Sequence, residues 1–232
     1  MLATATTPVH PVIHSLPTAA TIQPRLHHRA WRERVRFSND GFCDSPASIS
    51  LSRSLTMGLV AGDTTLSYRG LAELGLGIRQ GWDLAADNLV RAARCPEGTC
   101  FYLRDAVHTG LIDAPPTTSD GGAGGTAVQV KVPGAPVTSW LAHPRTFTIL
   151  HRHLQTRLGP ELIYLAPLPD LLIACATPDP TGTGQEVAGL LTGGLAEARI
   201  PGEHYICATP LVYRLGFPAV VGGGGPGAGL GS

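Results

Sequence analysis

The feature that most constrains the fold is a pair of apolar runs, Leu162–Ala166 and Leu171–Ala176, separated by the turn-forming residues Pro167–Asp170. Each run has the length of a strand, and the prolines and aspartate between them are typical of a turn. The runs do not alternate strictly between apolar and polar residues, which indicates a sheet covered on at least one side by helices. We therefore predict a β-hairpin in the core of the protein.

Hydrophobic periodicity predicts the elements around this hairpin. Helices are expected at Arg69–Leu74, Gln80–Ala93, His143–Leu158 and Gln185–Ala198. Further strands are expected at Ile49–Leu51, Met57–Ala61, Thr99–Leu103, Val128–Val132, Tyr205–Ala208 and Leu211–Arg214. This order predicts an α+β fold, in which a mixed or antiparallel sheet is covered by amphipathic helices.

Composition predicts how the chain is divided. With 29 Gly and 20 Pro among 232 residues, about a fifth of the chain favours turns, loops or linkers. The segment DAPPTTSDGGAGG (Asp113–Gly125) cannot bury apolar surface and reads as a linker. We expect a disordered or basic segment (1–36), an N-terminal α/β block (37–112), a linker (113–126), a C-terminal α+β block (127–218) and a disordered Gly-rich tail (219–232). The two blocks can still share one sheet.

Charge argues against several partners. The formal net charge is zero, which gives no general attraction to nucleic acid or to an anionic membrane. No apolar run approaches the about 20 residues that a membrane span needs. Lys131 is the one lysine among 17 basic residues. This bias fits a bacterial, high-GC genome, and the alternative is arginine selected for carboxylate or phosphate recognition.

The segment Arg25–Arg36 is locally basic, with five arginines against Glu33. It fits a disordered tail that leads into a basic helix, or a translation start placed too far upstream. Two alternatives are a transit peptide and a basic surface patch that contacts RNA or a partner. The first residues lack the continuous apolar stretch of a secretory signal.

Five cysteines cannot all pair within one chain, which favours a reducing, cytoplasmic setting. Cys95 and Cys100, with His108 downstream, form the best candidate metal site, and zinc is the metal that prefers such ligands. A second close pair of ligands is missing unless Cys43 joins. A local disulfide or two free thiols are the other interpretations of Cys95 and Cys100.

Asp170 is the carboxylate inside the apolar hairpin and is the first candidate for a binding residue. Tyr164, Arg145, Tyr213 and Arg214 are expected to form a polar rim around it, with an ion pair between Arg214 and Asp170. His143, His151 and His153 are expected along the edge of the polar face of their helix. We find neither a nucleophile elbow nor a phosphate-binding glycine loop in the sequence.

Three segments together resemble the YtpQ-like family of uncharacterised bacterial proteins. They are LSYRGLAELGLGIRQGWDLAADNL (Leu66–Leu89), ELIYLAPLPDLLIACA (Glu161–Ala176) and ATPLVYRLG (Ala208–Gly216). The chain departs from the family at Pro169, where an arginine is usual, and in a shorter N-terminal region. The resemblance, which spans Leu66 to Gly216, implies a shared fold and no known catalytic residues.

These observations predict a non-enzymatic cytoplasmic protein that binds a protein partner as an accessory, adaptor or immunity-type factor. No cofactor is expected. The alternatives are a metal-binding protein or enzyme that uses Cys95, Cys100 and His108, and an RNA contact through Arg25–Arg36.

Overall fold

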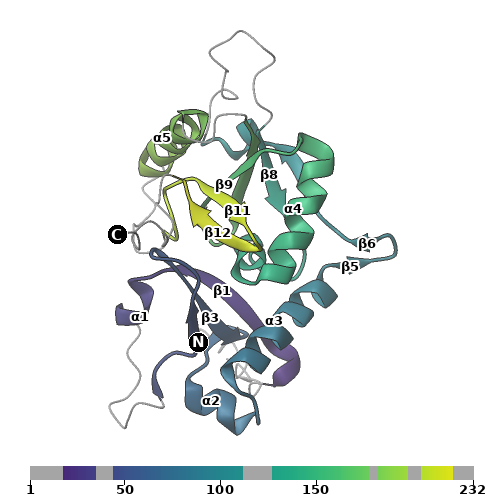
Figure 1. The fold of residues 1–232 in the computed structure, drawn as a ribbon, viewed down its shortest axis with the longest axis vertical. Helices are drawn as coiled ribbons and strands as arrows, with labels where there is room; N and C mark the ends of the chain where they lie inside the picture. The colour runs from purple at the N-terminus through teal and green to yellow at the C-terminus, as the bar shows by residue number, and fades with distance from the viewer. Residues whose placement is uncertain (1–17, 35–43, 112–126, 178–181, 198–204, 222–232) are drawn as a thin grey trace, which may run out of the picture.

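The computed structural model describes residues 18–34, 44–111, 127–177, 182–197 and 205–221, and it shows an α+β fold (Figure 1). All strand pairings among these residues are antiparallel, so the predicted fold class is confirmed. The predicted linker and the ends of the chain (1–17 and 222–232) lie outside the described residues. No helix among the described residues is long and apolar enough to cross a membrane.

The larger sheet has six strands in the order β12-β11-β9-β10-β8-β7. The predicted hairpin lies at its centre, where Tyr164 pairs with Ala174, and a bulge near Leu171 shifts the register by one residue. The strands are β7 (Tyr102–Asp105), β8 (Ala127–Lys131), β9 (Leu162–Leu168), β10 (Leu171–Ala176), β11 (Leu211–Arg214) and β12 (Phe217–Val220).

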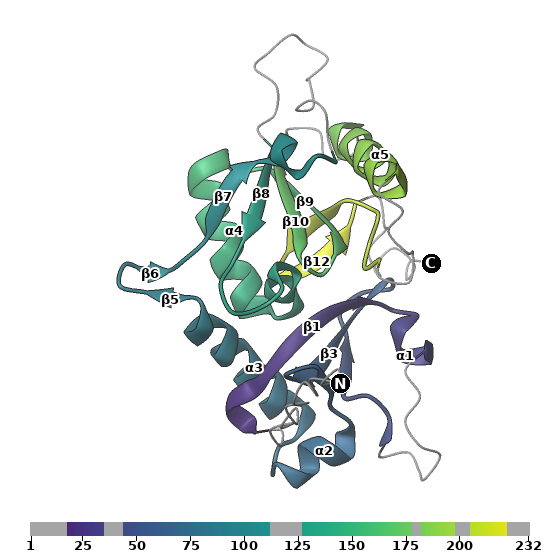
Figure 2. The ribbon, with the colours of Figure 1, turned by 180° about the vertical axis from the view of Figure 1, so that it is seen from behind.

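Helices α4 (Pro144–Leu158) and α5 (Gly182–Glu197) cover opposite faces of this sheet (Figure 2). Tyr164 belongs to the same core cluster as Phe147 of α4, whereas its neighbour Ile163 packs in a second cluster with Val187 of α5. Because successive strand residues point to opposite faces, β9 is buried on both sides. This two-sided burial explains why the hairpin sequence is apolar without strict alternation.

The second sheet contains β1 (Ile22–His28), β3 (Leu55–Ala61) and β2 (Ser48–Ser50) in that order, and β4 (Thr64–Thr65) pairs with β3. The predicted basic helix over Arg25–Arg36 is therefore wrong. Residues Ile22–His28 form a strand, and only α1 (Trp31–Arg34) is helical. Alternate burial along β1 explains the strand, because one face enters the core while the other carries the polar residues.

The short helix α2 (Tyr68–Glu73) and the longer α3 (Ile78–Ala92) confirm the two helices predicted in this part of the chain. Ser67 caps α2 by accepting a hydrogen bond from the amide of Gly70 at 3.0 Å. The predicted strand Thr99–Leu103 is divided between β7 and a small hairpin of β5 (Arg94–Cys95) and β6 (Gly98–Thr99).

The segment Tyr205–Ala208 is not a strand, which corrects the sequence prediction. It still lies along the end of β9. The amides of Ile206 and Cys207 donate to the carbonyls of Pro167 and Ala166 at 2.8 and 3.3 Å. It therefore continues the β11 side of the sheet without regular pairing.

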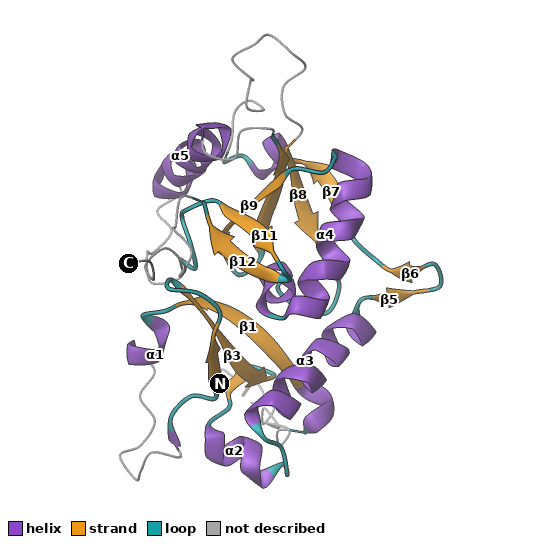
Figure 3. Ribbon diagram, viewed as in Figure 1, coloured by secondary structure: helices purple, strands orange, loops and turns teal. Residues whose placement is uncertain are grey.

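A buried 3-10 helix, η4 (Val137–Ala142), lies at the junction of the two sheets, whose strands are orange in Figure 3. All six of its residues are buried, and it contacts β1, β10, β12 and α4. The main core cluster runs through it and includes Leu26 of β1, Trp140 of η4 and Leu150 of α4. Two shorter 3-10 helices are η1 (Ala19–Thr21) and η3 (Ala106–Thr109).

Replacing Leu150 with alanine tests this account of the core. Leu150 is fully buried, so Leu150→Ala should lower the free energy of unfolding by about 2–5 kcal/mol in urea denaturation. The matched control is Leu190→Ala, because Leu190 of α5 is 46% exposed, and it should change stability by no more than about 0.5 kcal/mol. Equal losses in the two variants would contradict the placement of α4 over the sheet.

Candidate functional site

The four predicted binding residues do not meet in one site. Asp170 lies in the turn between β9 and β10, whereas Arg214 ends β11. Leu211 pairs with Tyr164 and runs antiparallel to β9, so Arg214 lies toward the start of β9 and away from the turn. The expected Asp170–Arg214 ion pair is therefore not formed among the described residues.

Asp170 interacts with the basic side chains of other elements. Its carbonyl accepts a hydrogen bond from Lys131 Nζ at 2.9 Å. Its negative charge acts on Arg25, whose guanidinium is half-buried and donates to Ser139 Oγ at 3.3 Å. Burial nevertheless lowers the pKa of Arg25, and the attraction of Asp170 and Asp63 only partly offsets that effect.

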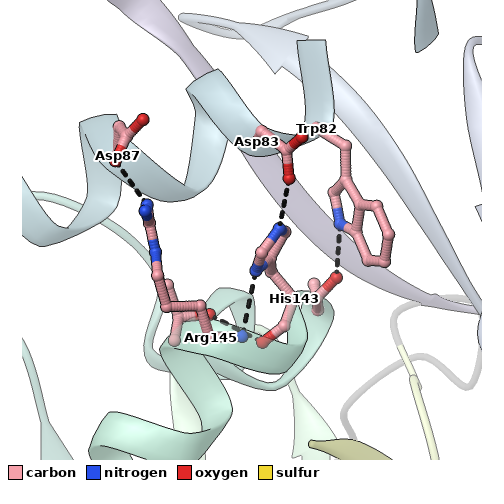
Figure 4. A network of polar contacts seen from close by, with 7 residues as sticks. Trp82, Asp83, Asp87, His143 and Arg145 are labelled. Atoms are coloured by element: carbon pink, nitrogen blue, oxygen red, sulfur yellow. Dashed lines mark hydrogen bonds and ion pairs between the residues drawn. The ribbon is translucent and has the colours of Figure 1, made fainter. Parts of the chain in front are cut away.

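Arg145 belongs to a polar network that joins α3 to the start of α4 (Figure 4). Its Nη2 donates to Asp87 Oδ1 at 2.5 Å, and both side chains are about half exposed. One turn earlier on α3, Asp83 Oδ1 lies 3.1 Å from His143 Nε2. The indole of Trp82 donates to the carbonyl of Ala142 at 2.8 Å.

His143 is fully engaged as the cap of α4. Its Nδ1 accepts a hydrogen bond from the amide of Arg145 at 3.1 Å, while Nε2 faces Asp83. Burial lowers the pKa of His143, and Asp83 partly offsets this by favouring the charged ring. Since both ring nitrogens have partners, the arrangement fastens α4 to α3 and does not present a general base. The expectation that His143 edges the polar face is wrong, because its side chain is buried.

Tyr213 takes part in a second cluster, inside the sheet–α4 interface. Its hydroxyl lies 2.9 Å from Thr148 Oγ1, and its ring stacks on His151 with centroids 4.1 Å apart. His151 Nδ1 lies 2.6 Å from the hydroxyl of Tyr164. Burial lowers the pKa of His151 and raises that of Tyr164, so both groups stay neutral near neutral pH.

The expected surface position of His151 is also wrong, since the residue is buried. The sequence contains a signal for this burial. His151 lies four residues after Phe147 and three before Leu154, which places all three on the apolar stripe of the helix. A buried histidine whose nitrogen bonds to a tyrosine is a satisfied core residue.

The predicted metal site is corrected by a disulfide between Cys95 and Cys100, whose Cα atoms are 6.0 Å apart. A sulfur in a disulfide is not a thiolate and cannot ligate zinc in that form. His108 lies in η3, beyond the far end of β7. Across the described ranges no three His, Cys, Asp or Glu side chains cluster in a way that could hold a metal ion.

A pocket of about 500 Å³ opens where the end of β1 meets the segment before β11. No sequence pattern predicted it, because its two sides are far apart in the chain. Its polar side chains come from His28 and Ser54 on one side and from Tyr205, Cys207 and Thr209 on the other. Ala30, Ile206 and Ala208 supply apolar surface.

The basic segment is only partly available to a nucleic acid. Arg29 and Arg32 are exposed, but Arg25 is held against Ser139 between the two sheets. Comparison of the chain with protein-family models, with curated proteins and with solved structures finds no match.

The buried His151 predicts a pH-dependent stability. The pKa of His151 is lower in the folded protein than in the unfolded chain, so below about 6.5 the unfolded state binds more protons and folding weakens. We expect the free energy of unfolding to fall between pH 7.5 and 5.5, and His151→Gln to make that fall smaller. The dependence should not vanish, because burial also lowers the pKa of His143 and of His153. The same slope in both proteins would contradict this role of His151.

The disulfide predicts a redox-dependent stability. Cys95 and Cys100 are five positions apart, and closing so short a loop stabilises the folded state by about 2 kcal/mol. Urea unfolding with dithiothreitol should show that loss, and a Cys95→Ser/Cys100→Ser variant should show it without the reductant. The double variant serves as its own control, since dithiothreitol should change its stability no further.

Proposed function

We propose that this protein is a non-enzymatic partner-binding factor, of accessory, adaptor or immunity type, and that the tip of the β11–β12 hairpin contacts its partner. The hairpin tip is defined as Arg214, Leu215, Gly216 and Phe217. The observation that carries the proposal is Leu215, an apolar side chain that is 88% exposed on a backbone with a positive φ of 51°.

Both properties of Leu215 are unfavourable for the free protein. A residue with a Cβ in the left-handed region is destabilised by about 1–2 kcal/mol, which glycine would avoid. Because Leu215 is exposed, burial of its side chain in the protein core does not offset this destabilisation. A strained, exposed, apolar residue is a sound basis for a functional hypothesis, because a partner can bury it.

The hairpin tip is held rigidly in place. Gly216 lies so close to the start of α4 that a Cβ there would come within 2.6 Å of Pro144 Cβ. The ring of Phe217 lies 6.5 Å from that of Trp82, which is itself bonded to Ala142. A contact residue on a fixed support loses little conformational entropy when it binds.

The surroundings of the tip also suit an interface. Phe217 is 37% exposed, so two apolar side chains lie together on this surface. Arg214 is exposed, and Asp83 and the Asp87–Arg145 pair lie where the middle of α3 meets the start of α4. An apolar centre with a polar rim is typical of protein–protein contacts. The partner we infer is a folded protein with an apolar recess bordered by charged side chains.

The cytoplasmic setting and the kinship with YtpQ-like proteins are parts of this proposal. Cys175 and Cys207 are buried free thiols, as expected in a reducing compartment. In a reducing compartment, the disulfide between Cys95 and Cys100 would form and break reversibly.

Two substitutions of Leu215 separate the effect of its strained backbone on stability from the effect of its side chain on partner binding. Leu215→Gly should raise the free energy of unfolding above that of Leu215→Ala by about 1 kcal/mol, because only glycine relieves the positive φ. Both should weaken binding of the partner by at least about 2 kcal/mol, or roughly 30-fold in Kd, if Leu215 is a central contact.

The partner is identified by a photo-crosslinking amino acid at position 215 in the native cell, and its Kd for the purified chain is then measured. Position 190 of α5 is the matched control, since Leu190 is also exposed. The proposal is overturned if positions 215 and 190 give the same crosslinks, or if Leu215→Ala binds as tightly as the unchanged protein.

A further inference from the structure

We propose that the pocket between the end of β1 and the Tyr205–Thr209 segment binds a small organic anion with an apolar body. Its volume of about 500 Å³ lies within the range of small-molecule sites, which is roughly 300–1,000 Å³. One wall comes from the end of β1 and the turn before β3, and the other from the segment that precedes β11. Arg29 donates its amide to the carbonyl of Ser54 at 2.8 Å, which joins the two turns of the first wall.

The first wall presents a hydrogen-bond donor in His28. Its Nδ1 accepts a hydrogen bond from the amide of Ala30 at 3.2 Å. In the neutral ring the proton must then lie on Nε2, and in the charged ring Nε2 also carries a proton. His28 therefore offers an N–H group in either state.

Ser54 supplies an unpartnered polar group. Its Oγ is buried and has no hydrogen-bond partner in the described part of the chain, although the residue lines the pocket. Buried hydroxyls are normally hydrogen-bonded, so this atom indicates a missing partner. A ligand oxygen in the pocket would accept its proton.

The second wall adds further donors. Cys207 Sγ donates to the carbonyl of Thr209 at 3.3 Å and lies 3.7 Å from Thr209 Oγ1. The single S–H proton of Cys207 serves the carbonyl, and the Thr209 hydroxyl can still donate a hydrogen bond to a ligand in the pocket. Tyr205 contributes a phenol, which is also able to donate.

The charges near the pocket favour a negative ligand. No carboxylate is among its described lining residues. Arg29 lies between the lining residues His28 and Ala30, Arg53 precedes Ser54, and both arginines are exposed. The donors of the lining residues match a carboxylate or phosphate oxygen, and the positive charges of Arg29 and Arg53 on the neighbouring backbone favour an anion. Ile206 and Ala208 would contact the apolar part of the ligand.

Alkylation of Cys207 tests this site directly in the full-length chain. Iodoacetamide is applied to a Cys43→Ser variant, and labelling is located by peptide mass spectrometry. Cys207 is 6% exposed and lines the pocket, so it should react, whereas Cys175 is fully buried in the sheet and serves as the internal control. At about 10 mM benzoate or phenyl phosphate, the labelling rate should fall about tenfold, as expected for a Kd near 1 mM. Benzamide, which is the neutral match of benzoate, should protect far less.

An Arg29→Gln/Arg53→Gln variant should lose the protection by both anions, while Arg94→Gln, at an exposed position after α3, should keep it. The stronger of the two probes identifies the preferred headgroup. The proposal is overturned if Cys207 is as unreactive as Cys175, if neither anion protects, or if benzamide protects equally. A negative result for the pocket would not contradict the proposal that the hairpin tip binds a partner. That proposal is tested separately, with Leu215 variants and a protein partner.

Discussion

The fold depends on satisfying the polar backbone of η4, a segment that is buried along its whole length. Buried amides and carbonyls are destabilising unless each finds a partner. Three other elements supply hydrogen-bond partners for the backbone of η4. The indole of Trp82 in α3 donates to the carbonyl of Ala142, the hydroxyl of Thr146 in α4 donates to the carbonyl of Trp140, and the amide of Thr138 donates to the carbonyl of Pro169 in the central hairpin. Each of these bonds joins η4 to a different element, and Arg25 of β1 donates to Ser139 Oγ of η4. The two sheets are therefore held together by a segment that belongs to neither.

Both candidate surfaces depend on this junction. The hairpin tip rests on Pro144 and Trp82, which are positioned by the end of η4 and the cap of α4. The pocket lies where the end of β1, in the second sheet, meets the segment that precedes β11 of the larger sheet. The polar network of Figure 4, which first suggests acid–base chemistry, has its histidine nitrogens occupied and serves to position α4.

Local patterns were sufficient to predict the central hairpin, the helices and the α+β class, because apolar periodicity reports directly on burial. The same logic failed at β1, where the arginines obscured the alternation of Ile22, Pro24 and Leu26. It also failed at η4, whose short run has no period and whose partners are distant in sequence. Asp170 and Arg214 could not be assigned to opposite ends of the sheet without the register of β11 on β9. The pocket is lined by residues from near both ends of the chain. A local sequence pattern cannot predict that such distant residues lie side by side.

The contacts between β1 and the region of η4 have a consequence for synthesis on the ribosome. Gln23 bonds to the carbonyl of Gly134 across 111 positions, and Arg25 bonds to Ser139 across 114. Such high contact order slows folding, since a long loop must close before its contacts form. The first strand therefore leaves the ribosome well before the segment that buries it. At about 5–20 residues per second, β1 waits several seconds for that segment to be made.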